Sequence, residues 1–487
     1  MKASTVTRRL ESFHRIVQTR RRAWDVPGVA VAVVADGHTV FVEGFGTRRL
    51  GYDQPVTSDT VFAICSCTKA FTTTLLEMLA HEGVLDWDRP VREVLPEFEM
   101  FDSVIGARLT ARDLVTHRCG LPRHDFVWYG SSATRAELVR ALRYLEPSAD
   151  LRTTYQYQNL MYMTAGYLAG KLLDSSWEAL LRERLLEPLG MASTTMSVAD
   201  LKSCGVGARP HEKSRAKMRE VPYRSLDAVG PAGAINSTVN DMTRWLRMHF
   251  GGGRFEGKRL VAAAALRDTY RPHMSMGDGG DDVEFQLVSY GLGWTVMSYR
   301  GHRVITHSGG IDGFRCRVAM LPEVGVGAVV LTNGDTALPH VLTWELFDTL
   351  LGLEPAAWSR RDKADTRREE TQQRQRRHRQ RAGRTRGTQP SHWLEDYTGI
   401  YQHPGYGEIR VARRGRKLVA SLNDLDGRLE HFHYDFFEFH CRRWGTPMLL
   451  AFTTGADGGI PCLSLPLQEG VADITFKRSQ PEGASSP

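Results

Sequence analysis

The chain has 487 residues, which is too long for one compact hydrophobic core, so we expect two domains. Hydrophobic residues make up 41% of it and aromatic residues 9%, enough for ordinary globular cores. No apolar run reaches the roughly 18–20 residues of a membrane-spanning helix, so we expect no membrane partner.

The net charge of +7 invites a nucleic-acid interpretation, but the excess is local. Residues 359–390 hold 12 Lys and Arg against 4 Asp and Glu, which leaves 51 basic and 52 acidic residues elsewhere. This tract also lacks the interleaved aromatic residues typical of nucleic-acid-binding segments. We therefore expect a solvated linker there and no nucleic-acid partner.

The N-terminus predicts the first helix of a domain, because Leu10, Phe13, Ile16 and Val17 recur at helical spacing with arginines on the other faces. It lacks the apolar core of a signal peptide; a transit peptide is the alternative. The seven cysteines are odd in number and scattered, without CxxC spacing. We expect free thiols in a reducing compartment, the cytoplasm or alternatively the mitochondrion, and no zinc site.

Secondary structure is predicted first as a hairpin and then as a run of helices. Residues 28–46 form two alternating apolar strands joined at an Asp-Gly pair. An apolar helix is expected over residues 66–82, ended by a glycine. Further helical patterns follow at 135–145, 159–173 and 239–250.

From about residue 289 the pattern returns to strands. Four short strands are expected at 290–299, 303–308, 314–321 and 326–333. Strands at the two ends of this region can pair in one antiparallel sheet that the intervening helices cover. We therefore assign residues 1–354 to one domain.

The remaining chain predicts a linker and a second domain. Residues 355–390 are rich in Arg and Gln and show no apolar stripe, which is typical of a linker, helical or disordered. Short strands then recur, so residues 391–487 predict a small β-barrel or sandwich. We interpret His431, His433 and His440 in these strands as surface or core residues and not as metal ligands.

Ser66 and Lys69 are the first candidate catalytic pair. Three residues apart at the start of a helix, they share one face, so the amine can reach the hydroxyl. A desolvated lysine has a lowered pKa and can take the serine proton, while the helix N-terminus favours a developing oxyanion. The spacing alone is ambiguous, because Ser214 and Lys217 copy it in a polar stretch. The structural alternative is a helix-cap serine with a solvated lysine.

Two further motifs are weak when taken singly. Tyr157 and Asn159 precede a helix, where a phenol can shuttle a proton and an amide can hold a carbonyl. The alternative is a core tyrosine with a helix-capping asparagine. His307 begins a His-Ser-Gly-Gly turn at a strand end, where an extended substrate could pair with the strand. An incidental histidine is the alternative, and His403 repeats the pattern.

The order of these motifs resembles the serine β-lactamase and DD-peptidase superfamily, whose Ser-x-x-Lys helix is a known signature. The sequence is most similar to its class C β-lactamase-like branch, which includes esterases and D-aminopeptidases. The similarity extends over nearly all of residues 10–350, through segments such as VPGVAVAVVADGHTVF, LTARDLVTHRCGLP and YGLGW. The region 391–487 resembles the lipocalin-like barrel of some of these hydrolases, which caps or shapes the active site or supports assembly.

The resemblance implies an α/β (α+β) fold, with an antiparallel sheet flanked by helices, an all-helical subdomain and a C-terminal β-barrel. It also implies a role for each matching residue. The catalytic residues would be Ser66 as nucleophile, Lys69 and Tyr157 as general acid and base, and His307. Substrate would bind to Asn159, Ser308 and Gly309, and the backbone N–H groups of Ser66 and Gly310 would form the oxyanion hole.

Two positions depart from the family pattern. Cys119 replaces the serine usual after the Thr-His pair. His307 stands where β-lactamases carry a lysine, so the permanent cation that grips an acidic substrate group is missing. Neutral esters or peptides are therefore favoured over substrates with a β-lactam-type carboxylate.

We expect a serine hydrolase that acts without a cofactor on small esters, amides or short peptides, including those with D-residues. β-Lactamase, DD-carboxypeptidase or transpeptidase activity is one alternative. A non-catalytic scaffold or filament-forming protein is the other, although three intact catalytic residues argue against it. A homo-oligomer is considered because an appended barrel often lies at a subunit contact in similar proteins. The pocket walls are expected from loops 123–133 and 270–288.

Overall fold

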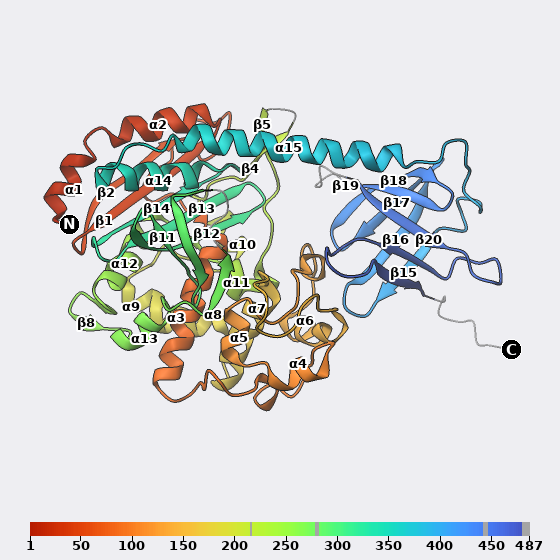
Figure 1. Ribbon diagram of the computed structural model, residues 1–487, viewed down its shortest axis with the longest axis horizontal. Coiled ribbons are helices and arrows are strands. Elements are labelled where there is room, and N and C mark those ends of the chain that lie inside the picture. Colours follow the sequence, from red (N-terminus) through yellow and green to blue (C-terminus); the bar gives the residue numbers. More distant parts are fainter. Residues whose placement is uncertain (215–216, 278–281, 442–446, 480–487) are drawn as a thin grey trace.

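The computed structural model describes residues 1–214, 217–277, 282–441 and 447–479. Along the chain it has a large α/β domain, a long helix and a closed β-barrel (Figure 1). Parts of three predicted segments lie outside the described residues: the middle of the Ser214–Lys217 motif, residues 278–281 of loop 270–288, and residues 442–446 and 480–487 of the barrel segment 391–487.

An eight-stranded antiparallel sheet forms the centre of the first domain, in the order β2-β1-β14-β13-β12-β11-β10-β9. Its strands are β1 (Gly28–Ala35), β2 (His38–Gly46), β9 (Met274–Gly277), β10 (Phe285–Tyr290), β11 (Thr295–Tyr299), β12 (His302–Ile311), β13 (Phe314–Leu321) and β14 (Val326–Thr332). The N-terminal hairpin pairs with the last strand through β1 and β14, both fully buried. The predicted antiparallel sheet built from both ends of the domain is confirmed.

The segment 290–299, expected as one strand, is divided between β10 and β11. The break falls at Gly293, whose φ of +80° lies in the left-handed region. A Cβ at this position would lie 2.8 Å from the carbonyl oxygen of Lys69. The glycine thus lets the chain pass close to the helix that carries the candidate catalytic lysine.

Helices cover both faces of the sheet (Figure 1). One face packs against α1 (Ala3–Arg9), α2 (Phe13–Ala23) and α14 (Leu338–Leu351). The other packs against α3 (Thr68–His81), α12 (Val239–Phe250) and α13 (Ala263–Asp268). Behind α3 lies a helical subdomain, composed mainly of α4 (Ser103–Arg108), α5 (Ala111–Val115), α6 (Arg135–Ala141), α7 (Asn159–Leu172) and α8 (Trp177–Leu181).

The Arg- and Gln-rich segment forms one helix, α15 (Trp358–Ala382). It has no apolar stripe, but its first residue anchors it. The Trp358 ring is 1% exposed, packs among the rings of Phe285, Tyr299 and Trp344, and donates a 3.1 Å hydrogen bond to Asp348. After residue 359 the side chains are half-exposed or exposed. The first turns still contact the first domain, because Arg361 pairs with Glu284 at 2.7 Å and Asp362 lies 2.7 Å from His340 Nδ1.

The C-terminal region is a closed barrel, which settles the choice between barrel and sandwich. Its strands are β15 (Gly399–His403), β16 (Gly407–Arg414), β17 (Lys417–Leu422), β18 (Leu425–His433), β19 (Phe436–Cys441), β20 (Met448–Thr453), β21 (Cys462–Leu465) and β22 (Ile474–Arg478). Pairing of β15 with β22 closes it. Within the part of the chain described, none of the helices has the length and apolar character needed to cross a membrane.

Candidate active site

Ser66 lies in a single 3₁₀ turn, η1 (Cys65–Cys67), directly before α3. Cys65, the residue before it, has a left-handed backbone with a φ of +49°. Such a conformation is costly for a non-glycine residue and is found preferentially at functional sites. The turn is tied to the sheet, because the Cys67 thiol donates to the carbonyl oxygen of His307 at 3.3 Å.

Lys69 is fully buried beside this turn, with three polar neighbours around its amine. Its Nζ lies 3.3 Å from Ser66 Oγ, 2.8 Å from Asn159 Oδ1 and 2.9 Å from the carbonyl oxygen of Ala232. Burial, and next the nearby Arg123 guanidinium, hold the pKa of Lys69 well below its usual value. A neutral amine next to a serine hydroxyl can act as a general base.

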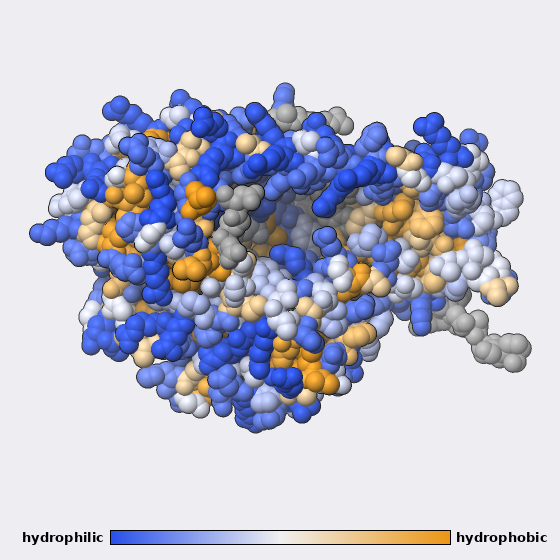
Figure 2. Space-filling model, viewed as in Figure 1, coloured by the Kyte–Doolittle hydropathy of each residue, from blue (hydrophilic) through white to orange (hydrophobic). Residues whose placement is uncertain are grey.

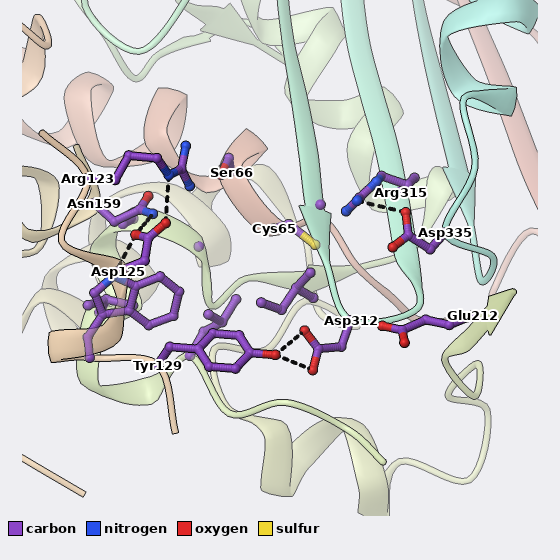
Figure 3. Close-up of a pocket in the computed structure, with 17 residues that line it drawn as sticks. Cys65, Ser66, Arg123, Asp125, Tyr129, Asn159, Glu212, Asp312, Arg315 and Asp335 are labelled. Carbon is purple, nitrogen blue, oxygen red and sulfur yellow. Dashed lines mark hydrogen bonds and ion pairs between the residues drawn. The ribbon is translucent and has the colours of Figure 1, made fainter. Parts of the chain in front are cut away.

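Asn159 is fixed by both ends of its amide. Its Oδ1 accepts from Lys69, and its Nδ2 donates to Asp125 Oδ1 at 3.1 Å. Asp125 in turn accepts from Arg123 Nε at 2.6 Å and from the Trp128 indole at 2.9 Å (Figure 3). The loop 123–128 therefore orients the amide, and through it the amine.

Tyr157 also lies against the amine, with Lys69 Nζ 4.7 Å from its ring centroid. Burial raises the pKa of Tyr157, and a hydrogen bond with Ser66 lowers it by less. The phenol is therefore protonated at neutral pH and can donate a proton. Its ring packs on the buried His117, with centroids 4.3 Å apart.

His307 is buried, and both of its ring nitrogens are within hydrogen-bond distance of a partner. Nδ1 lies 2.6 Å from the carbonyl oxygen of Ser308, so it carries the proton, and Nε2 accepts from Tyr290 at 2.9 Å. Burial lowers the pKa of His307 to about 3. The imidazole ring is thus neutral, and its two hydrogen bonds to residues of the sheet fix its orientation. The catalytic role of His307 stays a prediction.

The end of β12 runs past Ser66 with one edge open. β11 pairs with β12 as far as Thr306, and over residues 307–311 the described pairing is with β13 alone. Gly309 allows this close passage, because an added Cβ would lie 2.3 Å from the carbonyl oxygen of Ile64. An extended substrate can therefore reach the strand edge beside Ser66.

Two pockets meet at Ser66. The first, of about 250 Å³, we call the loop arm; it is lined chiefly by Asp125, Trp128, Tyr129, Glu212 and Asp312 (Figure 3). The second, of about 620 Å³, we call the basic arm; it is lined chiefly by Ser308, Arg315, Arg317, His340 and Glu369. Five residues line both arms: Ser66, Arg123, Gly310, Arg315 and Asp335. Because Glu369 belongs to α15, the basic arm lies beneath that helix, where Figure 2 shows a hollow between the first domain and the barrel.

The predicted site residues come together from three separate segments of the chain, 66–69, 157–159 and 307–310. Ser66, Lys69, Tyr157, Asn159, His307, Ser308, Gly309 and Gly310 all lie at this cleft or contact a residue that lines it. The competing motifs do not join them. Ser214 and Lys217 pair across the hairpin of β4 (His211–Ser214) and β5 (Lys217–Glu220), and His403 lies in the barrel.

Other predictions have mixed outcomes. Loop 123–133 lines the loop arm as expected, whereas none of the described residues of loop 270–288 lines either arm. Cys119 is buried, which raises the pKa of its thiol to about 12 and makes it unreactive. Arg123 and Asp125 were expected only as part of the pocket-wall loop 123–133. Their link to Lys69 through Asn159 was not predicted, because Asn159 lies 34 residues from Asp125 in the sequence.

In the barrel, His440 Nε2 lies 3.1 Å from Glu430 and 3.2 Å from Glu438. Among the described residues this is the one group with the geometry to hold a metal ion, and it is remote in sequence from every residue of the cleft.

Comparisons with known proteins agree with this geometry. The family model described as Beta-lactamase matches residues 13–352, and a domain of unknown function, DUF3471, matches residues 383–478. An unguisins hydrolase from Aspergillus violaceofuscus is 30% identical, over 86% of this chain and 77% of its own. The D-alanyl-D-alanine-carboxypeptidase/endopeptidase AmpH of Escherichia coli is 26% identical over 63% of this chain and 79% of its own.

Among solved structures, the octameric penicillin-binding protein homologue from Pyrococcus abyssi superposes with a TM-score of 0.63. It is 20% identical, and the match covers 96% of this chain and 99% of that one. The similarity therefore includes the α/β domain, the long helix and the barrel. At this level of identity it shows a shared fold. The more specific resemblance of the barrel to lipocalins stays a prediction.

Proposed function

Because the chain belongs to the serine β-lactamase and DD-peptidase family, and is thus a hydrolase of that kind, we propose that it cleaves amide, peptide or ester bonds through an acyl-enzyme on Ser66. The observation that carries this proposal is the buried Lys69 amine, 3.3 Å from Ser66 Oγ and with a lowered pKa. A solvated lysine beside a helix-capping serine would have neither feature.

In the first half of the reaction, Lys69 takes the Ser66 proton as Oγ attacks the substrate carbonyl carbon. The backbone N–H groups of Ser66 and Gly310 stabilise the resulting oxyanion. Asn159 Nδ2 donates one hydrogen to Asp125, and it can donate its second hydrogen to the carbonyl side of the bound substrate. The bond to the leaving group then breaks, and Tyr157 donates a proton to the leaving nitrogen or oxygen.

In the second half, water attacks the acyl carbonyl carbon. After the first half Lys69 is protonated and Tyr157 is not, so the Tyr157 phenolate takes a proton from the attacking water. The Lys69 ammonium returns its proton to Ser66 Oγ as the C–O bond to the acyl group breaks, which restores both residues. Passing the acyl group to an amine instead would give transpeptidation, which uses the same residues.

Short peptides or amides, including those with D-residues, are the favoured substrates. The open edge of β12 suits an extended chain, and one relative bears the name of a carboxypeptidase and endopeptidase. A homo-oligomer is part of the proposal, because a protein of the same fold is described as octameric. A panel of p-nitrophenyl esters, D- and L-aminoacyl anilides and nitrocefin separates esterase, peptidase and β-lactamase activity.

The assignment of the nucleophile is tested with a fluorophosphonate probe, which labels activated serines. Wild type should be labelled, Ser66→Ala should not be, and Ser214→Ala, which disrupts the competing motif, should be labelled at the wild-type rate. Lys69→Ala should slow labelling by at least about a hundredfold if the amine is the base. Labelling that persists in Ser66→Ala would overturn the proposal.

A further inference from the structure

Two neighbouring strands of the barrel bring two glutamates and a histidine to one point. In the register of β18 and β19, Glu430 lies directly opposite Glu438, and Arg428 lies opposite His440. Residues two apart on a strand share a face, so all four side chains lie on the same face of these two strands. The ligand atoms of the two glutamates and of His440 lie within 4.8 Å of one another.

The contacts of each carboxylate are divided between its two oxygens. Oε2 of Glu430 lies 3.1 Å from His440 Nε2, and Oε2 of Glu438 lies 3.2 Å from the same nitrogen. Oε1 of Glu430 lies 3.0 Å from Arg428 Nε. Oε1 of Glu438 lies 4.0 Å from Arg381 Nε, on α15. Each carboxylate thus turns one oxygen toward the imidazole and the other toward an arginine, as in metal sites where an outer group orients each ligand.

A hydrogen-bonded imidazole explains this arrangement poorly. Nε2 carries at most one proton, which can point at one oxygen only, while two glutamates compete for it. In the described part of the chain Nε2 is buried, and no hydrogen bond to either oxygen has acceptable geometry. Glu438 is only 9% exposed, and two like charges directly opposite on a sheet destabilise it. A divalent cation between the three groups would satisfy both carboxylates and the ring nitrogen.

A zinc ion fits the spacing and the ligand types. Zinc binds an imidazole nitrogen and a carboxylate oxygen each at about 2.0–2.1 Å, so two such ligands at the tetrahedral angle are about 3.3 Å apart. The two pairs in the barrel are 3.1 and 3.2 Å apart. One nitrogen and two oxygens form a ligand set that zinc accepts, with water as the fourth ligand. His440 also lines a pocket of about 600 Å³, which gives the ion an entry path.

We propose that Glu430, Glu438 and His440 form a zinc-binding site that fastens β18 to β19. The site lies where α15 meets the barrel (Figure 1), so zinc should stabilise the barrel next to this junction. It replaces the sequence interpretation of His440 as an ordinary surface or core residue. That interpretation considered histidines alone, whereas two of the three ligands are glutamates. The inference is independent of the acyl-enzyme on Ser66.

Zinc binding is measured on the full chain, after treatment with a chelator and removal of that chelator. Wild type should bind one zinc ion per chain in isothermal titration calorimetry, and zinc should raise its thermal unfolding temperature. His440→Gln and Glu438→Gln should each weaken zinc binding by at least about tenfold and remove most of the thermal shift. His431→Gln is the matched control, because it removes a histidine of β18 that bonds within its own turn, and it should bind zinc as wild type does.

The metal-free protein separates a zinc site from an ion pair. Without metal, Glu438→Gln should unfold at the wild-type temperature or above it, because the substitution removes one of two opposing negative charges. A lower unfolding temperature, together with no effect of zinc on wild type, would identify His440 as an imidazolium paired with both glutamates. The site is refuted if zinc neither binds to nor stabilises wild type, or if both variants bind it as tightly as wild type does.

Cobalt(II) distinguishes this site from the free cysteines. Cobalt bound to thiolates absorbs strongly in the near ultraviolet through charge transfer from sulfur, whereas cobalt bound to nitrogen and oxygen shows only weak visible bands. Wild type titrated with cobalt should show the weak bands alone, and His440→Gln should lose them. A strong near-ultraviolet band that persists in His440→Gln would place the metal on cysteines and overturn the proposal.

Discussion

At the scale of single residues, the environment of Lys69 matches a neutral amine. An uncharged amine has two N–H donors and one lone pair. Asn159 Oδ1 and the Ala232 carbonyl can accept these two donors. Because burial lowers the pKa of Lys69, the lone pair of the neutral amine is then available to the Ser66 hydroxyl, 3.3 Å away. An ammonium would have to donate to the serine as well, and could not take its proton.

Asn159→Asp should move the acid limb of the pH profile of kcat/KM to higher pH. It places a carboxylate where the amide oxygen now accepts from Lys69 at 2.8 Å. An adjacent anion favours the ammonium and raises the pKa of Lys69, so the neutral, active form is populated only at higher pH. Activity at neutral pH should fall by at least about tenfold and recover partly in alkaline buffer.

The profile is measured with a neutral p-nitrophenyl ester, so that charge repulsion with substrate does not contribute. Asn159→Ala is the control, because it removes the same hydrogen bonds without adding a charge and should not move the limb upward. A limb that stays in place in Asn159→Asp would mean that Lys69 is not the group titrating.

Which site residues could be found from sequence depends on how local their signal is. Ser66 and Lys69 are recognised because three residues of helix bring them together. Arg317 carries no such signal, since it alternates with apolar residues in an ordinary strand pattern. Its position in the cleft follows from its register opposite Ser308, which is a property of the folded chain.

At the scale of elements, the turn between β17 and β18 docks on the loop that carries Asp125. Asn423 donates to the carbonyl oxygen of Tyr129 at 3.2 Å, and the Asp424 N–H donates to that of Gly130 at 3.2 Å. Gly130 permits this contact, because a Cβ there would overlap the Asp424 carboxylate. The barrel thus supports one wall of the loop arm.

Arg224 joins the same contact from the hydrolase side. Its side chain is 3% exposed, lies 4.2 Å from the Tyr129 ring centroid, and pairs with Asp424 at 2.5 Å and more loosely with Asp312 at 3.4 Å. Asp312 also accepts from the Tyr129 hydroxyl at 2.6 Å. Removal of the Asp424 carboxylate therefore leaves a buried guanidinium with one distant partner.

Asp424→Ala should reduce kcat/KM by about tenfold for substrates long enough to fill the loop arm, and much less for p-nitrophenyl acetate. The expected cause is a displaced Tyr129 wall, so the loss should appear in KM more than in kcat. Asp457→Ala is the matched control, since that carboxylate accepts a hydrogen bond within its own barrel turn. Equal losses for long and short substrates would contradict a positioning role.

Elements with strong local signals were predicted from the sequence, and those shaped by tertiary contacts were not. The β1–β2 hairpin follows from its Asp36-Gly37 turn, where both residues have the positive φ that such a turn requires. The break in segment 290–299 was missed because it is required by the close approach of this segment to α3, which no local sequence pattern indicates. The anchoring of α15 was missed because one buried tryptophan produces no periodic pattern.

At the scale of the whole molecule, α15 is a strut between the two domains (Figure 1). Its 25 residues span about 37 Å at the usual helical rise. Trp358 fixes one end in the first domain's core, and beyond the other end the Thr385 N–H donates to His433 of the barrel at 3.2 Å. The barrel is therefore held by the strut, by the β17–β18 turn and by His124. The His124 ring nitrogen Nδ1 lies 2.5 Å from the Tyr406 hydroxyl, and its backbone N–H donates to Gln468 at 2.6 Å.

Lengthening this strut should mimic the loss of the turn contact. Four alanines inserted after Gln375, in the exposed part of α15, extend the helix by about 6 Å and shift the barrel along its axis. The β17–β18 turn then no longer reaches Gly130, and the contacts of His124 with the barrel are displaced as well, so kcat/KM for long substrates should fall at least as far as in Asp424→Ala. Adding Asp424→Ala to the insertion should cause no further loss, because the insertion already removes the contact that Asp424 makes.

Replacement of residues 372–375 by four alanines is the control, since it changes the same surface without changing the length. Small-angle scattering should show a longer molecule for the insertion and an unchanged one for the replacement. If the insertion leaves the kinetics at wild-type values while the molecule lengthens, the barrel does not position the loop arm. If the molecule does not lengthen, α15 bends to preserve the turn contact, and the strut is less rigid than its two anchors imply.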